Sequence, residues 1–125
     1  MNKTRILAFA AGALLVNLAT SAMAQNIVVG GKNFTEQQIM SQMTAQLLQA
    51  KGFKPDVKAG MGSAVVRQAQ ENGQIDVYWE YTGTSLITYN KINDRLSPAD
   101  TYAKVKELDA AKGLVWLNPS KANNT

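Results

Sequence analysis

The sequence predicts an α/β fold, with a mostly parallel sheet and helices on both of its faces. Short apolar segments, such as 27–29 and 114–117, alternate with longer amphipathic segments, such as 35–51 and 98–112. Glycines separate many of these segments. Strands that alternate with helices are typical of a parallel sheet, because each parallel connection needs a crossover.

Residues 1–24 have the pattern of a secretory signal peptide. Lys3 and Arg5 precede an apolar run from Ile6 to Val16, and Ala22-Met23-Ala24 matches an A-x-A cleavage site. The apolar run is too short to span a membrane, and the alternative is an uncleaved anchor. Because no cysteine is available for lipid attachment, we expect a mature chain of residues 25–125, free in a bacterial periplasm.

Composition excludes several classes of function. The leader supplies two of the net +4 charges, and the mature chain has no Lys/Arg-rich run, which makes nucleic acid a poor partner. The absence of His and Cys excludes Ser-His and Cys-His catalysis and His-based metal sites. The spacing of Glu36, Asp76 and Glu80 follows no catalytic template. We therefore expect no enzyme activity, no metal and no cofactor.

The first predicted strand and helix are residues 26–30 and a segment that begins at Thr35. Thr35 and Gln38 have the spacing of a capping box, in which each side chain bonds the backbone of the other residue. Gly52 stands where a left-handed helix end is expected. Three apolar residues at helical spacing predict the buried stripe of this helix: Ile39, Met43 and Leu47.

A second strand is predicted at 53–59, where Pro55 near its start indicates a sheet edge. Ser63 is placed to cap a helix at 64–72, and a third strand follows at 75–78. We expect a short helix after Gly83.

Ser97-Pro98-Ala99-Asp100 is the clearest helix start in the chain, with a cap, a first-turn proline and an acid. The helix presents Tyr102, Val105 and Leu108 and stops at Gly113. A fourth strand is expected at 114–117. The polar tail 118–125 follows this strand directly, which indicates a chain cut in mid-course.

Residues 76–84, with the sequence Asp-Val-Tyr-Trp-Glu-Tyr-Thr-Gly-Thr, hold three aromatic rings within four positions. They lie at the carboxyl end of the predicted strand 75–78, where open α/β sheets bind ligands. Aromatic faces suit a cation without hydrogen-bond donors, such as a quaternary ammonium. The alternative is that these rings pack in and around the core.

Four segments, in order and at sensible spacing, resemble the substrate-binding proteins of osmoprotectant ABC importers, which bind glycine betaine, choline or carnitine. They are 31–37 (GKNFTEQ), 71–78 (ENGQIDVY), 80–84 (EYTGT) and 114–125. The last resembles the family's crossing point between lobes. The resemblance implies a type II-like periplasmic binding protein with two α/β lobes, of which residues 25–125 are the N-terminal lobe, truncated near the hinge.

The resemblance also implies ligand-binding residues. Tyr81 matches a tyrosine of the family's aromatic cage around the trimethylammonium group. Lys32 matches a lysine, and Thr84 a threonine, that hold the ligand's carboxylate. Asn124 lies in the hinge-side segment that lines the pocket. A solvated turn is the alternative for Lys32, and a helix N-cap is the alternative for Thr84.

Two further residues are candidates for ligand contact. Asn33 follows Lys32, and Trp79 stands where many relatives have proline, so its ring either faces the ligand or packs. The function implied is the periplasmic solute-binding component of an ABC importer, which delivers a quaternary ammonium osmoprotectant to a membrane permease. Lys32 favours glycine betaine over choline. The alternative is a truncated lobe without a transport role, or with a role in protein contact.

Overall fold

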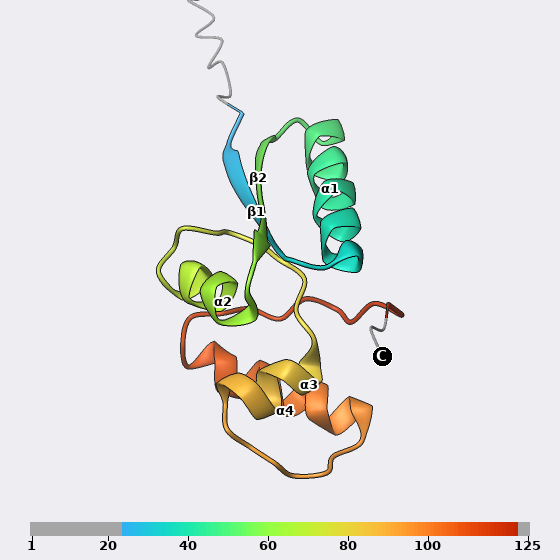
Figure 1. Ribbon diagram of the computed structural model, residues 1–125, viewed down its shortest axis with the longest axis vertical. Helices are drawn as coiled ribbons and strands as arrows, with labels where there is room; N and C mark the ends of the chain where they lie inside the picture. The colour runs from blue at the N-terminus through green and yellow to red at the C-terminus, as the bar shows by residue number, and fades with distance from the viewer. Residues whose placement is uncertain (1–23, 123–125) are drawn as a thin grey trace, which may run out of the picture.

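The computed structural model describes residues 24–122 and contains a small parallel sheet with helices around it (Figure 1). This architecture confirms the predicted α/β class. Apart from Ala24, the predicted leader lies outside the described residues. The elements in chain order are β1 (Asn26–Lys32), α1 (Thr35–Ala50), β2 (Lys54–Met61), α2 (Ser63–Glu71), α3 (Thr82–Thr84), the π-helical turn η1 (Ser85–Tyr89) and α4 (Pro98–Ala110).

The sheet pairs β1 with β2 in parallel, with Val29 opposite Val57. On the other side of β1, Val77 forms an isolated parallel bridge with Val29. The Gly30 N–H donates to the Val77 carbonyl at 2.8 Å. The expected strand 75–78 is reduced to this bridge. Beyond it the Trp79 carbonyl and the Tyr81 N–H bond side chains instead of a neighbouring strand.

Helices α1 and α2 cover opposite faces of β1, as predicted. A β-carbon built on Gly30 would lie 2.8 Å from the Ile75 side chain and 3.2 Å from Val66 of α2. A β-carbon on the next residue, Gly31, would collide with Ser41 of α1. Successive residues of a strand point to opposite faces, so the two glycines allow both helices to pack closely on the sheet.

The start of α1 differs from the prediction. Its N-cap is Phe34, which accepts the Gln38 N–H through its carbonyl at 3.1 Å, and no side chain caps the helix. The predicted Thr35–Gln38 capping box is therefore wrong, because the helix already includes Thr35 as its first residue. Gly52 follows the helix with a φ of +89°, which confirms the predicted left-handed end.

The predicted buried stripe of α1 is also wrong. Ile39, Met43 and Leu47 are each more than half exposed. The face that packs on the sheet is small and partly polar, and its buried residues are Gln37, Ser41 and Ala45. The Ser41 hydroxyl lies 3.0 Å from the Gly30 carbonyl, to which it donates. Close contact with a glycine-bearing strand selects small side chains on this helix face.

Helix α4 begins as predicted, since the Ser97 hydroxyl accepts the Asp100 N–H at 3.1 Å and Pro98 opens the helix. Helix α2 starts one residue earlier than expected, with Gly62 rather than Ser63 as its N-cap. The expected strand 114–117 is absent from the described residues. That segment is irregular, with Val115 and Leu117 largely exposed, because no strand lies beside it.

The packed core around the α2 face consists of Val66, Ala69 and Ile75, with Val28, Met61 and Tyr78 against them. Below it, α3, η1 and α4 form a second group of elements (Figure 1). The segment after α4 passes between these two groups and lies beside α1 at its end. Among residues 24–122, no helix is long and apolar enough to cross a membrane.

Candidate functional site

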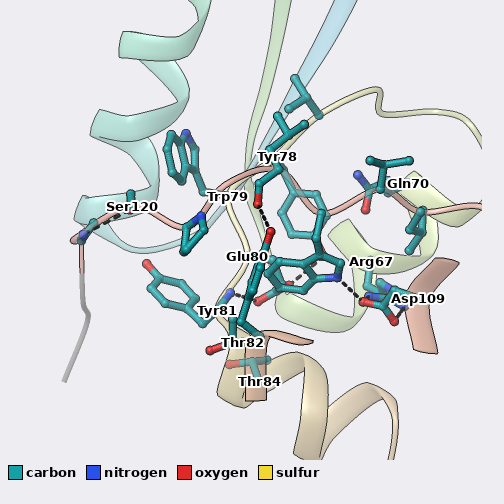
Figure 2. Close-up of a pocket in the computed structure, with 18 of the residues that line it drawn as sticks. Arg67, Gln70, Tyr78, Trp79, Glu80, Tyr81, Thr82, Thr84, Asp109 and Ser120 are labelled. Carbon is teal, nitrogen blue, oxygen red and sulfur yellow. Dashed lines mark hydrogen bonds and ion pairs between the residues drawn. The ribbon is translucent and has the colours of Figure 1, made fainter. Parts of the chain in front are cut away.

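A groove lies between two groups of elements: the sheet with α1 and α2, and the group formed by α3, η1 and α4 (Figure 2). One wall is the segment that follows the Val77 bridge, from Tyr78 to Thr84. The segment 114–120 lies along the groove as well. The aromatic-rich segment singled out in the sequence therefore lines this groove, at the end of the sheet where ligands were expected.

Tyr81 precedes α3 and is half-buried in the groove wall. Its hydroxyl donates to Glu36 Oε1 at 2.9 Å, and its ring centroid lies 6.0 Å from that of Phe34. Burial raises the pKa of the Tyr81 phenol; a hydrogen bond with Gln37 opposes this, and the Glu36 carboxylate adds to it. The phenol therefore stays neutral, with a fixed ring orientation.

Lys32 ends β1 and is buried, with 2% of its surface exposed. Its Nζ donates to Glu80 Oε1 at 2.5 Å and lies 5.1 Å from the centroid of the Tyr81 ring. The alternative of a solvated turn lysine is therefore wrong. The ammonium already has Glu80 as its counterion. Glu80 also bonds the Tyr81 N–H, so it connects Lys32 with Tyr81, although the sequence assigned no ligand-binding role to Glu80.

Glu80 joins three groups in this wall. Besides Lys32, it accepts the Tyr78 hydroxyl and the Tyr81 N–H, each at 2.7 Å. Burial, and then the negative charge of Glu80, raise the pKa of Tyr78 well above its ordinary value. Asp76 accepts the Val28 N–H at 2.7 Å. Glu80 and Asp76 thus each accept a backbone N–H.

Thr84 is the last residue of α3 and lines the groove (Figure 2). Thr84 is also the N-cap residue of η1, but its side chain makes no capping hydrogen bond. Asn33 is exposed and does not line the groove. Asn124 lies outside the described residues.

Trp79 is attached to α1. Its indole Nε1 donates to Thr44 Oγ1 at 2.9 Å, and its carbonyl accepts Gln37 Nε2 at 2.9 Å. In Figure 2 the ring lies beside α1 and on the far side from Asp109. The indole borders the exposed apolar face of α1, and Trp79 also lines the groove, so this residue packs on α1 at the edge of the groove.

The groove wall holds a second ion pair, which was not predicted from the sequence. Arg67 of α2 and Asp109 of α4 form a bidentate pair at 3.0 and 2.7 Å. Asp109 also accepts Ser85 Oγ, Asn90 Nδ2 and Trp116 Nε1. The sequence did contain a signal for this pair: Asp109 lies one turn after Val105, on the helix face that is buried, and a buried acid needs a partner.

The environment of Asp109 keeps it ionised. Burial by itself would raise the pKa of this carboxyl, but hydrogen bonds from Arg67, Asn90, Trp116 and Ser85 hold it well below its usual range. Burial likewise opposes the charge of Arg67, whereas its bonds to Asp109 and Glu71 raise the pKa of the guanidinium. No cluster of three potential metal ligands occurs among residues 24–122.

Comparisons with known proteins agree with this architecture. The chain is 53% identical over 104 residues to a glycine-betaine-binding protein of Pseudomonas aeruginosa, covering 83% of this chain and 33% of that protein. It is 35% identical over 122 residues to the glycine betaine-binding protein YehZ of Escherichia coli, covering 92% and 40%. The chain thus spans well under half the length of these relatives.

A solved structure gives the same result. The apo structure of YehZ from Escherichia coli matches with a TM-score of 0.75 and 35% identity, over 82% of this chain and 38% of that one. Residues 25–125 match the sequence profile of OpuAC, described as the substrate binding domain of an ABC-type glycine betaine transport system. On these findings the chain belongs to the OpuAC family of substrate-binding domains.

Proposed function

We propose that residues 25–125 form one lobe of a solute-binding protein for glycine betaine or a related quaternary ammonium compound. The observation that carries this proposal is the position of the Tyr81 ring in the groove wall, close to two carboxylates. Glu36 accepts the Tyr81 hydroxyl, and Glu80 accepts the Tyr81 backbone N–H. The family and the names of the relatives support the same ligand class.

The chemistry of the ligand fits this arrangement. A trimethylammonium group donates no strong hydrogen bond, so its affinity comes from cation–π attraction and apolar burial, about 0.5–2 kcal/mol for one ring. Glu36 adds negative charge near the ring, where the charge of Glu80 balances that of Lys32. The carboxylate of glycine betaine would have Thr84 and Lys32 as partners. Because Lys32 is already paired with Glu80, we assign most of the affinity to the cationic head.

The proposal is tested with the full chain by NMR titration, which measures weak binding. We expect millimolar affinity for glycine betaine, since an open groove leaves much of the ligand in water. The matched probe is 3,3-dimethylbutanoate, in which carbon replaces the charged nitrogen. It should bind more weakly than glycine betaine, because it keeps the apolar surface and the carboxylate but lacks the cation.

Two variants test the role of Tyr81. Tyr81→Ala should weaken glycine betaine about 5- to 30-fold, the equivalent of about 1–2 kcal/mol. Tyr81→Phe should cost less than about threefold, because the ring face remains. Equal losses in both variants would assign the effect to the hydroxyl. No response to any quaternary ammonium in the wild-type chain would favour the alternative, a lobe without a ligand.

We propose further that the leader directs export to the periplasm and that the protein delivers its ligand to a membrane permease. The n-region, the apolar run and Ala22-Met23-Ala24 support export, and the transport system in the family description supports the permease. Mass spectrometry of exported protein should find Gln25 as the first residue. Retention of residues before Ala24 would contradict this.

A further inference from the structure

We infer that Glu80 is a positioning residue that makes the Tyr81 site acceptable to a cation, by compensating the charge of Lys32. This inference rests on the proposed function, because it concerns the same ligand class. On this inference, Glu80 determines the ratio of two affinities: that for ligands with a carboxylate, such as glycine betaine, and that for ligands without one, such as choline.

Lys32 would by itself be a poor neighbour for a bound cation. Its Nζ lies 5.1 Å from the centroid of the Tyr81 ring, within the range of a cation–π contact. A ligand cation on the opposite face of the same ring would come to roughly 9 Å from Nζ. At that distance two like charges near a protein surface repel enough to change an affinity about tenfold.

Glu80 is placed to cancel this repulsion. Its side chain is 6% exposed and contacts the Lys32 ammonium directly at 2.5 Å. Its second oxygen accepts the Tyr78 hydroxyl, so the carboxylate cannot easily turn away from the lysine. The Tyr81 N–H shares the oxygen that Lys32 uses, and this fixes Tyr81 relative to the ion pair.

The charges nearest the ring then favour a cation. Lys32 and Glu80 cancel, and Glu36, which accepts the Tyr81 hydroxyl at 2.9 Å, leaves one net negative charge beside the ring. Removal of the Glu80 charge would turn this balance to neutral and leave Lys32 without a counterion. A free ammonium repels choline, whereas it attracts the carboxylate of glycine betaine.

The experiment compares choline and glycine betaine by NMR titration of the full chain and its variants. In Glu80→Gln, which keeps size and an acceptor oxygen, choline should bind about tenfold more weakly. Glycine betaine should lose less, so that the ratio of the two dissociation constants changes at least about threefold. In Lys32→Met with Glu80→Gln, choline affinity should return to within about threefold of the wild type.

The matched control is Glu71→Gln, which removes one carboxylate that pairs with Arg67 and lies outside the groove lining. It should leave the ratio unchanged. An unchanged ratio in folded Glu80→Gln, or no rescue in the double variant, would overturn the inference. If Glu80→Gln does not fold, the double variant decides. Charge compensation requires that the double variant fold and bind choline. A double variant that is unfolded or does not bind choline would overturn the inference.

The two proposals fail in different ways. If the wild type binds choline but not glycine betaine, the proposed ligand class stands and the preference for glycine betaine is wrong. The Glu80 variants then test compensation through choline alone. If the wild type binds both ligands and Glu80→Gln changes neither, only the role of Glu80 is wrong. If the wild type binds no quaternary ammonium, both are wrong.

Discussion

Two buried ion pairs, Arg67–Asp109 and Lys32–Glu80, lie in the groove wall, and they are built differently. Asp109 receives five hydrogen bonds, from Arg67 Nη1 and Nη2, Ser85, Asn90 and Trp116. Glu80 receives three, from Lys32, Tyr78 and the Tyr81 backbone. The guanidinium is held in a rigid fork, whereas the lysine makes a single contact with its partner.

The difference separates a structural ion pair from one suited to a ligand. The Arg67–Asp109 pair connects α2, η1, α4 and the segment with Trp116, and it has little capacity left for a further partner. The Lys32–Glu80 pair is less saturated and touches the Tyr81 ring. Hydrogen-bond saturation therefore distinguishes two buried ion pairs that would look equivalent from their charges.

The largest expected effect is on the saturated pair. Asp109→Ala should lower the free energy of unfolding by about 3–5 kcal/mol, because it leaves a buried guanidinium without its partner. Urea denaturation measures the change. The control is Arg67→Met combined with Asp109→Leu, which removes both charges and should recover part of the loss. A single-variant loss under 1 kcal/mol would contradict the structural role.

The pH dependence of the free energy of unfolding should reflect the titration of the Asp109 carboxyl. The folded-state pKa of Asp109 is depressed, so its stabilisation is complete above the unfolded value of about 4 and is lost as pH falls towards the folded value. Asp109→Asn should cost about 2–3 kcal/mol at pH 6. The difference from wild type should shrink below about pH 4. A difference that grows on acidification would contradict the sign.

Loss of one donor from each carboxylate tests saturation directly. Tyr78→Phe removes one of three hydrogen bonds to Glu80 and should cost about 2 kcal/mol, whereas Trp116→Phe removes one of five to Asp109 and should cost about 1 kcal/mol. Thermal or urea unfolding of both variants gives the comparison. If Trp116→Phe costs clearly more, the number of bonds does not determine how well each carboxylate tolerates a loss.

The smallest effect should come from the rim of the Arg67 cluster. Glu71 contacts Arg67 Nε at 2.5 Å, but its side chain is 38% exposed. Glu71→Gln should change the free energy of unfolding by less than about 0.5 kcal/mol, because water screens the pair. Urea denaturation beside Asp109→Ala measures this, and a loss above about 2 kcal/mol would place Glu71 within the buried network.

The structure brings together three of the residues to which the resemblance pointed. Lys32, Tyr81 and Thr84 all line the groove. The segment 31–37 pointed to Lys32, and the segment 80–84 pointed to Tyr81 and Thr84. Asn33 lies outside the groove lining. The roles of the carboxylates were harder to predict, because Glu80 and Lys32 are 48 positions apart. No local pattern shows which acid a buried lysine contacts.

What the sequence determined by itself rests on local rules. The alternation of strand and helix predicted the α/β class, and Ser97-Pro98 with Asp100 predicted the start of α4, because capping needs only neighbouring residues. What tertiary structure decided depends on contacts between distant segments. It selected the small face of α1 over the apolar one, since β1 approaches closely at Gly31. It joined Arg67 with Asp109 across 42 positions, because burial of either charge requires the other.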